Sequence, residues 1–372
     1  MTELEPGLAR PTAAHIVEAP KRPSLRAATR VLVQPSAAVA GLVLFVFALQ
    51  VIKTGARSLV PLLEGLEVSG ALNSVGFGWL LAYGAFSGSP VAAIGITLLA
   101  GGVLSEAEAF GVVGGSRLGA SFIVLAVGFV LYLRKRRNAD GLYIGVVALL
   151  TTFTTQGPAI ALGLVSLRLG WLDGVTFHTP AMFLDFIDAT FGPPVKLIDS
   201  ALPGWAMFTT GVAVLLGSFT VFDRALPQLE AGSGRLANAF TMLNRRPLMF
   251  LAGCVVTSVT LSVSISLTLL VPLSLKGYLK REHVIPYVMG ANITTFIDTL
   301  AGALLLGGQS AFTVVLTEML AVAAVSAVLL TAVYGPYSRA ILASAHWTTS
   351  EHSHLAAFLG AIVAVPLVLL LL

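Results

Sequence analysis

Long apolar runs separated by short polar links dominate the pattern of this chain. From residue 37 onward, apolar runs recur at about the twenty-residue length that an α-helix needs to cross the hydrocarbon core of a bilayer. The pattern predicts spanning helices at 37–60, 110–133, 141–167, 205–223, 284–306, 312–334 and 355–372. We therefore predict an all-α integral membrane protein.

Two further apolar runs, 77–104 and 248–275, contain polar interruptions. The stretch Ser-Gly-Ser-Pro at 87–90 interrupts the first run, and Ser-Val-Ser at 262–264 interrupts the second. A backbone break at membrane depth is tolerated only against protein or a water-filled cavity, because lipid cannot satisfy the freed backbone groups. We therefore expect each run to form a re-entrant helical hairpin that enters and leaves on one side of the bilayer.

Composition agrees with a membrane location. Of 372 residues, 56% are hydrophobic and 11% charged, and the mean hydropathy is +0.90, which excludes an ordinary water-soluble domain. The single cysteine, Cys254, excludes an intrachain disulfide and a cysteine-based metal site. The pI of about 9.3 would suit a nucleic-acid-binding protein, but the basic residues lie at predicted helix ends. We expect the lipid bilayer as partner and no nucleic acid.

The distribution of basic residues predicts an orientation. If the N-terminus is cytoplasmic, 17 of the 22 Lys and Arg residues fall on the cytoplasmic side, as the positive-inside rule requires. Residues 1–35 contain five prolines and lack the short apolar core of a secretory signal, so we expect a disordered cytoplasmic tail. The chain is predicted to be a multi-pass protein of the plasma membrane.

An offset of 175 residues aligns the two halves of the chain. The aligned pairs are Gly78 with Gly253, Ser87 with Ser262, Ser89 with Ser264, Gly102 with Gly277, and Gly115 with Gly290. Because the first helices of the halves are predicted to cross in opposite directions, the repeat is inverted. The predicted division is a tail (1–35), a first repeat (36–156), an extracytoplasmic insertion (157–204), a second repeat (205–334), and a C-terminal link and helix (335–372).

Inverted repeats of this kind place substrate and coupling ions near the bilayer midplane, between broken helices. The alternative is that the small residues merely allow close helix packing. Equal spacing between the Ser-x-Ser break and the glycine-led motif in both halves favours a binding site.

The motifs resemble those of the type II sodium/phosphate cotransporter family. Each repeat of that family carries Gln-Ser-Ser-Ser followed by Gly-(Ala/Ser)-Asn-Ile-Gly-Thr-(Thr/Ser); this chain has Gly-Ser-Arg-Leu-Gly-Ala-Ser at 115–121 and Gly-Ala-Asn-Ile-Thr-Thr at 290–295. Phe86 and Leu261 stand where the glutamines would be, and Arg117 stands where the first asparagine would be. The resemblance covers roughly residues 40–155 and 205–330.

The resemblance implies sodium-coupled symport of inorganic phosphate or a related small anion, with sodium as the coupling ion and no other cofactor. The residues expected at the substrate are Ser87, Ser89, Ser116, Arg117, Ser262, Ser264 and Asn292. The residues expected at the ion are Ser121, Ser266, Thr294, Thr295 and Asp298.

Charges inside membrane segments usually face a cavity or a partner. Arg117 either binds the anion, for which its planar guanidinium is suited, or replaces the charge of a sodium ion. Alternatively, it forms a permanent ion pair with Asp298 or Glu318 that only fixes helix packing. Asp298 is a candidate for binding sodium or a proton, and Glu318 is a candidate proton site.

A polar run at 151–156, followed by Gly157-Pro158, ends one predicted helix. It either breaks the helix and lines a pathway, or its threonine hydroxyls bond to carbonyl groups of the helix itself.

Two rival functions stay open at this point: a ligand-binding membrane sensor derived from a transporter, and a proton-coupled transporter of another oxyanion. An enzyme is not expected, because no His/Asp/Glu constellation would position a nucleophile and a base. The pattern makes no prediction of an oligomeric state.

Overall fold

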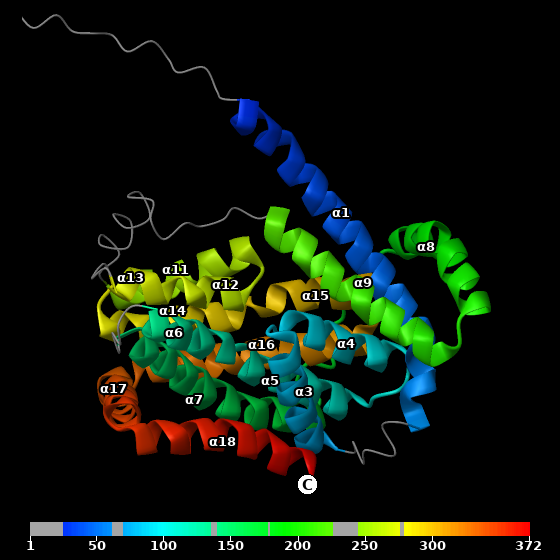
Figure 1. Ribbon diagram of the computed structural model, residues 1–372. Helices are drawn as coiled ribbons and strands as arrows, with labels where there is room; N and C mark the ends of the chain where they lie inside the picture. The colour runs from blue at the N-terminus through cyan, green and yellow to red at the C-terminus, as the bar shows by residue number, and fades with distance from the viewer. Residues whose placement is uncertain (1–24, 62–69, 135–139, 178, 226–244, 276–278) are drawn as a thin grey trace, which may run out of the picture.

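The computed structural model describes residues 25–61, 70–134, 140–177, 179–225, 245–275 and 279–372, and within these ranges every regular element is a helix (Figure 1). The helices are α1 (Leu25–Gly55), η1 (Ala56–Leu59), α3 (Ala71–Ala85), α4 (Ser89–Ala100), α5 (Glu106–Ala120), α6 (Phe122–Arg134), α7 (Asp140–Arg168), α8 (Ala181–Ala201), α9 (Gly204–Ala225), α11 (Arg246–Thr260), α12 (Val263–Thr268), α13 (Leu270–Leu275), α14 (Arg281–Thr294), α15 (Phe296–Leu305), α16 (Gln309–Thr331), α17 (Tyr334–Ser350) and α18 (His352–Leu370).

Seven segments of the described chain are long and apolar enough to cross a membrane. They are Ser36–Leu59, Glu106–Val130, Gly141–Arg168, Gly204–Phe222, Arg281–Leu305, Gln309–Thr331 and His352–Leu370. Each coincides with one predicted helix to within a few residues. The prediction of seven apolar helices of spanning length is therefore confirmed, as a multi-pass membrane protein requires.

Both predicted interruptions are helix breaks. Phe86 is the C-cap of α3 and Leu261 the C-cap of α11, with φ of 50° and 47°, the only positive φ angles of non-glycine residues in the described ranges. A left-handed L-residue costs roughly 1–2 kcal/mol. After the second break, Ser262 caps α12, because its hydroxyl oxygen accepts a hydrogen bond of 3.3 Å from the Ile265 backbone N–H.

Two of the spanning segments consist of two helices joined at a single residue. Ser121 separates α5 from α6, and Thr295 separates α14 from α15. In Figure 1 the chain runs from α5 to α6 toward one end of the bundle and from α14 to α15 toward the other end.

The halves pack their helices through equivalent glycines. A Cβ atom at Gly78 would lie 2.3 Å from the Val112 carbonyl oxygen, and one at Gly253 would lie 2.0 Å from the Tyr287 carbonyl oxygen. Gly115 and Gly290 approach α3 and α11 just as closely, since a Cβ atom there would lie 2.0 Å and 2.2 Å from carbonyl oxygens. Only glycine allows such helix contacts, so α3 with α5 and α11 with α14 form matching pairs.

The remaining helices surround these pairs. Helices α1 (blue) and α9 (green) lie side by side along one edge of the bundle, and α17 and α18 (orange to red) lie along another (Figure 1). The C-terminal helix α18 packs on α3, where the Tyr83 hydroxyl donates a 2.8 Å hydrogen bond to the Ile362 carbonyl.

The expected tail is too long at its C-terminal end. Helix α1 begins at Leu25, because residues 25–35 contain several good helix formers such as Leu, Arg and Ala. Residues 1–24 lie outside the described ranges. So do several residues of the basic clusters used to predict the orientation, at 135–137, 226–244 and 276–278, and Gly277 of the aligned pairs.

Two helices lie where the pattern predicted a link and an insertion. Helix α17 occupies most of the link at 335–350, and α8 lies within the insertion. Helix α8 buries Ile187, Phe191 and Val195, one side chain per turn, and packs on α1. Its aspartates and paired prolines obscured this amphipathic pattern. Helix α7 also continues past residue 157 to Arg168.

Candidate functional site

Arg117 lies in the interior, 2% exposed, near the C-terminal end of α5. Its Nη1 donates a 3.2 Å hydrogen bond to the Thr295 hydroxyl, and its Nη2 donates a 2.5 Å bond to the Thr299 hydroxyl. The guanidinium carbon lies 4.7 Å from the ring centre of Phe296, within range of a cation–π interaction. The first half thus places its cation against α15 of the second half.

Asp298, in the first turn of α15, is the ion-pair partner of this arginine. Its Oδ1 lies 3.6 Å from Arg117 Nη2 and accepts hydrogen bonds from the backbone N–H (2.5 Å) and hydroxyl (2.9 Å) of Thr299. A carboxylate is also favoured at a helix N-terminus by the helix dipole. Asp298 Oδ2 and Arg117 Nε are buried and have no hydrogen-bond partner. The pair is therefore buried but incompletely satisfied.

A second carboxyl group approaches Arg117 from α16. Glu318 is fully buried and interacts electrostatically with Arg117. A Cβ atom at Gly114, one turn before Arg117, would lie 2.7 Å from Glu318 Oε1, so this close approach depends on glycine. Neither Glu318 oxygen has a hydrogen-bond partner.

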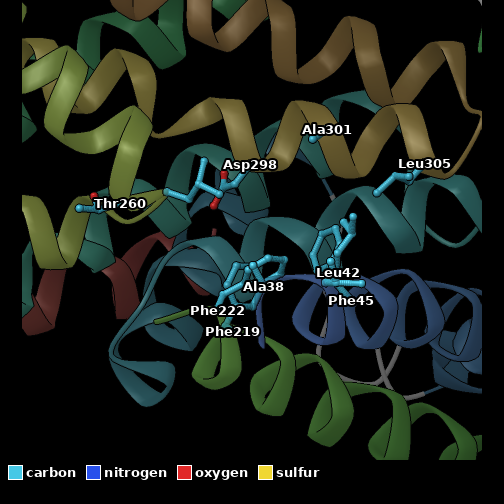
Figure 2. Close-up of a pocket in the computed structure, with 11 residues that line it drawn as sticks. Ala38, Leu42, Phe45, Phe219, Phe222, Thr260, Asp298, Ala301 and Leu305 are labelled. Atoms are coloured by element: carbon cyan, nitrogen blue, oxygen red, sulfur yellow. The ribbon is translucent and has the colours of Figure 1, made fainter. Parts of the chain in front are cut away.

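A cavity of about 330 Å³ ends on Asp298 (Figure 2). Thr260 and Leu261, at the break after α11, also line this cavity. The other lining residues are apolar and come from α1, α9 and α15: Ala38, Val39, Leu42, Phe45, Phe219, Phe222, Ala301 and Leu305. The cavity thus reaches both the second helix break and Asp298, the carboxylate of the buried ion pair.

The serines of the first half occupy two kinds of position. Ser87 is half-buried in the break, and Ser89 is buried at the start of α4. Ser116 and Ser121 donate their hydroxyl protons to carbonyl groups three residues earlier, at 2.6 Å and 2.8 Å. These two serines keep only lone pairs for a ligand.

The serines of the second half differ in how far their hydroxyls are satisfied. Ser266 accepts a 2.7 Å hydrogen bond from Thr257 and lies 2.9 Å from the Tyr287 hydroxyl. Ser264 Oγ is buried without a hydrogen-bond partner, whereas Ser262 caps α12. Ser264 is thus the motif serine with an unused buried hydroxyl.

The remaining predicted residues belong to two separate groups. Asn292 donates a 3.2 Å hydrogen bond to Thr152 of α7, and Thr294 donates to the carbonyl oxygens of Cys254 and Gly290. Thr295 accepts from Arg117. The structure therefore brings Arg117, Thr295 and Asp298 together, and it directs Asn292 and Thr294 to other partners.

Thr299 is the site residue that the sequence reasoning missed. It bonds to both members of the ion pair. The signal was present, because Thr295 and Thr299 are four residues apart and so lie on one face of α15. A search for threonines spaced by one turn around Asp298 would have found it.

The polar run of α7 does not break the helix. Thr151, Thr152, Thr154 and Thr155 each donate to the carbonyl group four residues earlier, at 2.6–3.0 Å, and α7 continues through Pro158. The alternative of back-bonding threonines is confirmed.

Comparisons with known proteins add no assignment: the chain matches no protein-family model, no curated protein and no solved structure. The described residues contain no group of three or more His, Cys, Asp or Glu side chains that could hold a metal ion. The chemistry that the site offers is a buried guanidinium, held by one carboxylate beside a cavity and approached by a second carboxyl group.

Proposed function

We propose that this protein is a secondary transporter of a small anion and that Arg117 binds the anion. The observation that carries the proposal is the buried Arg117–Asp298 pair, of which Asp298 lines a cavity that also reaches a helix break. Intramembrane charges are costly and typically serve a transport pathway. Phosphate is the first candidate anion, by the resemblance of the two motifs.

Two inverted repeats with re-entrant hairpins form the framework of this transporter. Four observations support the repeat: the ends of α3 and α5 agree with those of α11 and α14 to within one residue at an offset of 175, and there are two equivalent left-handed C-caps, two equivalent pairs of glycine contacts, and opposite chain directions of the broken spans. Repeats of this kind move against each other around a central site, which gives alternating access.

Asp298 is the ionic partner of the Arg117 guanidinium when no substrate is bound. Both terminal nitrogens of the guanidinium are engaged, so an incoming oxyanion must take over contacts that Asp298 and the threonines now make. A guanidinium binds phosphate, sulfate and carboxylate by the same planar fork, so the exchange is chemically matched. The resident carboxylate keeps the buried charge paired while the site is empty.

Binding of the anion requires a cation. The anion adds a negative charge to a buried cluster that already holds two carboxyl groups and a single guanidinium. A co-bound sodium ion or proton offsets this charge, because uncompensated charge in a low-dielectric interior is strongly unfavourable. The charge balance of the site thus ties anion movement to a cation gradient.

Flux measurements in liposomes test the proposal. Purified protein is reconstituted, and uptake of labelled phosphate, sulfate and small carboxylates is followed under an imposed sodium gradient, a proton gradient or neither. We expect one anion to accumulate under a cation gradient, and Arg117→Gln to reduce its uptake to the level of protein-free liposomes. Arg168→Gln, at the exposed end of α7, is the matched control and should transport normally.

Absence of flux for every anion under every gradient would overturn the proposal. Anion binding without flux would identify a ligand-binding sensor instead.

A further inference from the structure

The two carboxyl groups beside Arg117 have different surroundings. Asp298 accepts two hydrogen bonds, contacts the guanidinium and lines the cavity. Glu318 is 0% exposed, and both of its oxygens lack a hydrogen-bond partner. Hydrogen bonds and ion pairs stabilise a buried carboxylate, so Asp298 is well supported as an anion. Glu318 has only the electrostatic interaction with Arg117.

The immediate neighbours of Glu318 favour a proton over a metal cation. A Cβ atom at Gly114 would lie 2.7 Å from Glu318 Oε1 and 2.9 and 3.1 Å from two side-chain carbons of Ile160. Ile160 therefore lies beside the Glu318 carboxyl group and makes one wall of its site apolar. A hard cation such as sodium needs several oxygen ligands around it. A proton needs only the carboxyl group itself.

The helices packed against α16 bring few other titratable groups to this site. Arg117 comes from α5 and Asp298 from α15, while α4 carries no titratable side chain. The phenol groups on the other neighbours have partners elsewhere. Tyr143 of α7 lies under Arg281, and Tyr287 of α14 lies beside Ser266. On α17, Tyr334 lies under Arg246 and Tyr337 lies beside Thr154. Arg117 is therefore the charged group that Glu318 and Asp298 share.

From these observations, and resting on the proposed anion transport, we propose that Glu318 is the proton-binding residue that couples transport to a proton gradient. A proton on Glu318 removes one negative charge from the surroundings of Arg117 and so raises its affinity for the anion. By linkage, a bound anion raises the affinity of Glu318 for the proton to the same degree. Proton and anion then cross together, and the net charge of the buried cluster stays constant.

The test compares three proteins in liposomes without sodium: the natural chain, Glu318→Gln and the exposed control Glu351→Gln. Exchange of labelled phosphate is measured at equal pH on both sides, at about pH 6 and about pH 8, where phosphate itself also titrates. This titration affects all three proteins equally, so the readout is the difference between variants. At the higher pH, the natural chain and Glu351→Gln should lose apparent affinity for phosphate. Their loss should exceed that of Glu318→Gln by up to about tenfold per pH unit.

Accumulation driven by a proton gradient should also disappear in Glu318→Gln. Persistence of the full pH dependence or of proton-driven accumulation in this variant would overturn the assignment of Glu318. A strict requirement for sodium in the natural chain would overturn proton coupling while leaving anion transport intact. Absence of phosphate, sulfate and carboxylate exchange in the natural chain would instead contradict the proposed function.

A second measurement covers the case in which Glu318→Gln does not fold. Phosphate is added to the natural chain in weakly buffered detergent solution, and proton uptake is followed with a pH indicator. Glu318→Asp, which retains a carboxyl group, should still take up protons, with a shifted pH midpoint. Anion binding without proton uptake by the natural chain, or an unshifted midpoint in Glu318→Asp, would count against Glu318.

Discussion

The two halves of the molecule contain matching helix pairs, α3 with α5 and α11 with α14, but differ in the chemistry at positions 175 residues apart. Arg117 lies on α5, and the equivalent position on α14 is Asn292. Asp298 lies on α15, and its counterpart on α6 is Ile123. At these two positions each half holds one charge, and the residue 175 positions away is uncharged. The ion pair therefore joins residues of different halves.

This difference separates two roles of the repeated positions. The glycines and the left-handed C-caps determine how helices pack within each half, and they have the same geometry in both. The motif residues reach across to the opposite half: Arg117 contacts α15, and Asn292 bonds to Thr152 of α7. The packing glycines are thus identical in both halves, whereas Arg117 and Asn292, which contact the opposite half, differ.

The largest expected difference between the halves is that the starts of α5 and α14 lie on opposite sides of the membrane. Glu106 and Lys280 are exposed at the starts of α5 and α14. In a Cys254→Ser background, Glu106→Cys should react with a membrane-impermeant maleimide added outside cells. Lys280→Cys should react only after permeabilisation, because the basic links are expected to be cytoplasmic. Labelling of both cysteines from the same side would contradict the proposed inverted repeat.

Removal of Arg117 should have the largest effect on stability. Arg117→Gln leaves Asp298 buried without its ion-pair partner, which we expect to cost about 3–5 kcal/mol of unfolding free energy. Asn292→Ala, at the equivalent position, removes one neutral hydrogen bond and should cost about 1 kcal/mol. Thermal and denaturant unfolding in detergent measure both.

A double variant sharpens this comparison. Arg117→Leu with Asp298→Leu removes both charges together, and much of the lost stability should return. Equal costs for Arg117→Gln and Asn292→Ala would contradict a special role of the charged position.

A smaller effect than that of Arg117→Gln is expected at the packing glycines. Gly78→Ala and Gly253→Ala each place a methyl group against a carbonyl oxygen, so each should cost about 1–3 kcal/mol. Gly84→Ala in α3, where the new methyl group has open space, should instead stabilise by up to about 1 kcal/mol. Unfolding temperatures of the three variants provide the measurement. A large cost at one packing glycine alone would show that the halves do not pack alike.

Much of the fold was predictable because spanning helices have a strong signal in hydropathy. The seven spans and the breaks at Phe86 and Leu261 follow from runs of apolar residues and their polar interruptions. Helices α8 and α17 were missed, since their mixed composition resembles a link and their amphipathic faces are stabilised by packing on neighbours. Short amphipathic helices depend on tertiary contacts more than on propensity.

The candidate site was predictable in part. Intramembrane charge alone singled out Arg117, Asp298 and Glu318, and a pair between Arg117 and Asp298 was one of the open alternatives. The bridging role of Thr299 and the cavity beside Thr260 were not predicted, because both depend on how α1, α9, α11 and α15 meet.

By itself, the sequence determined the membrane class, the seven apolar helices, the offset of 175 residues and the identity of the buried charges. These properties are local or periodic, so they can be read from the linear sequence without knowledge of tertiary contacts. Only the tertiary structure decided that Asp298 contacts Arg117 while Glu318 remains without a hydrogen bond. The reason is physical: these groups are far apart in the chain, so the packing of α5 against α15 and α16 decides which carboxylate contacts the arginine.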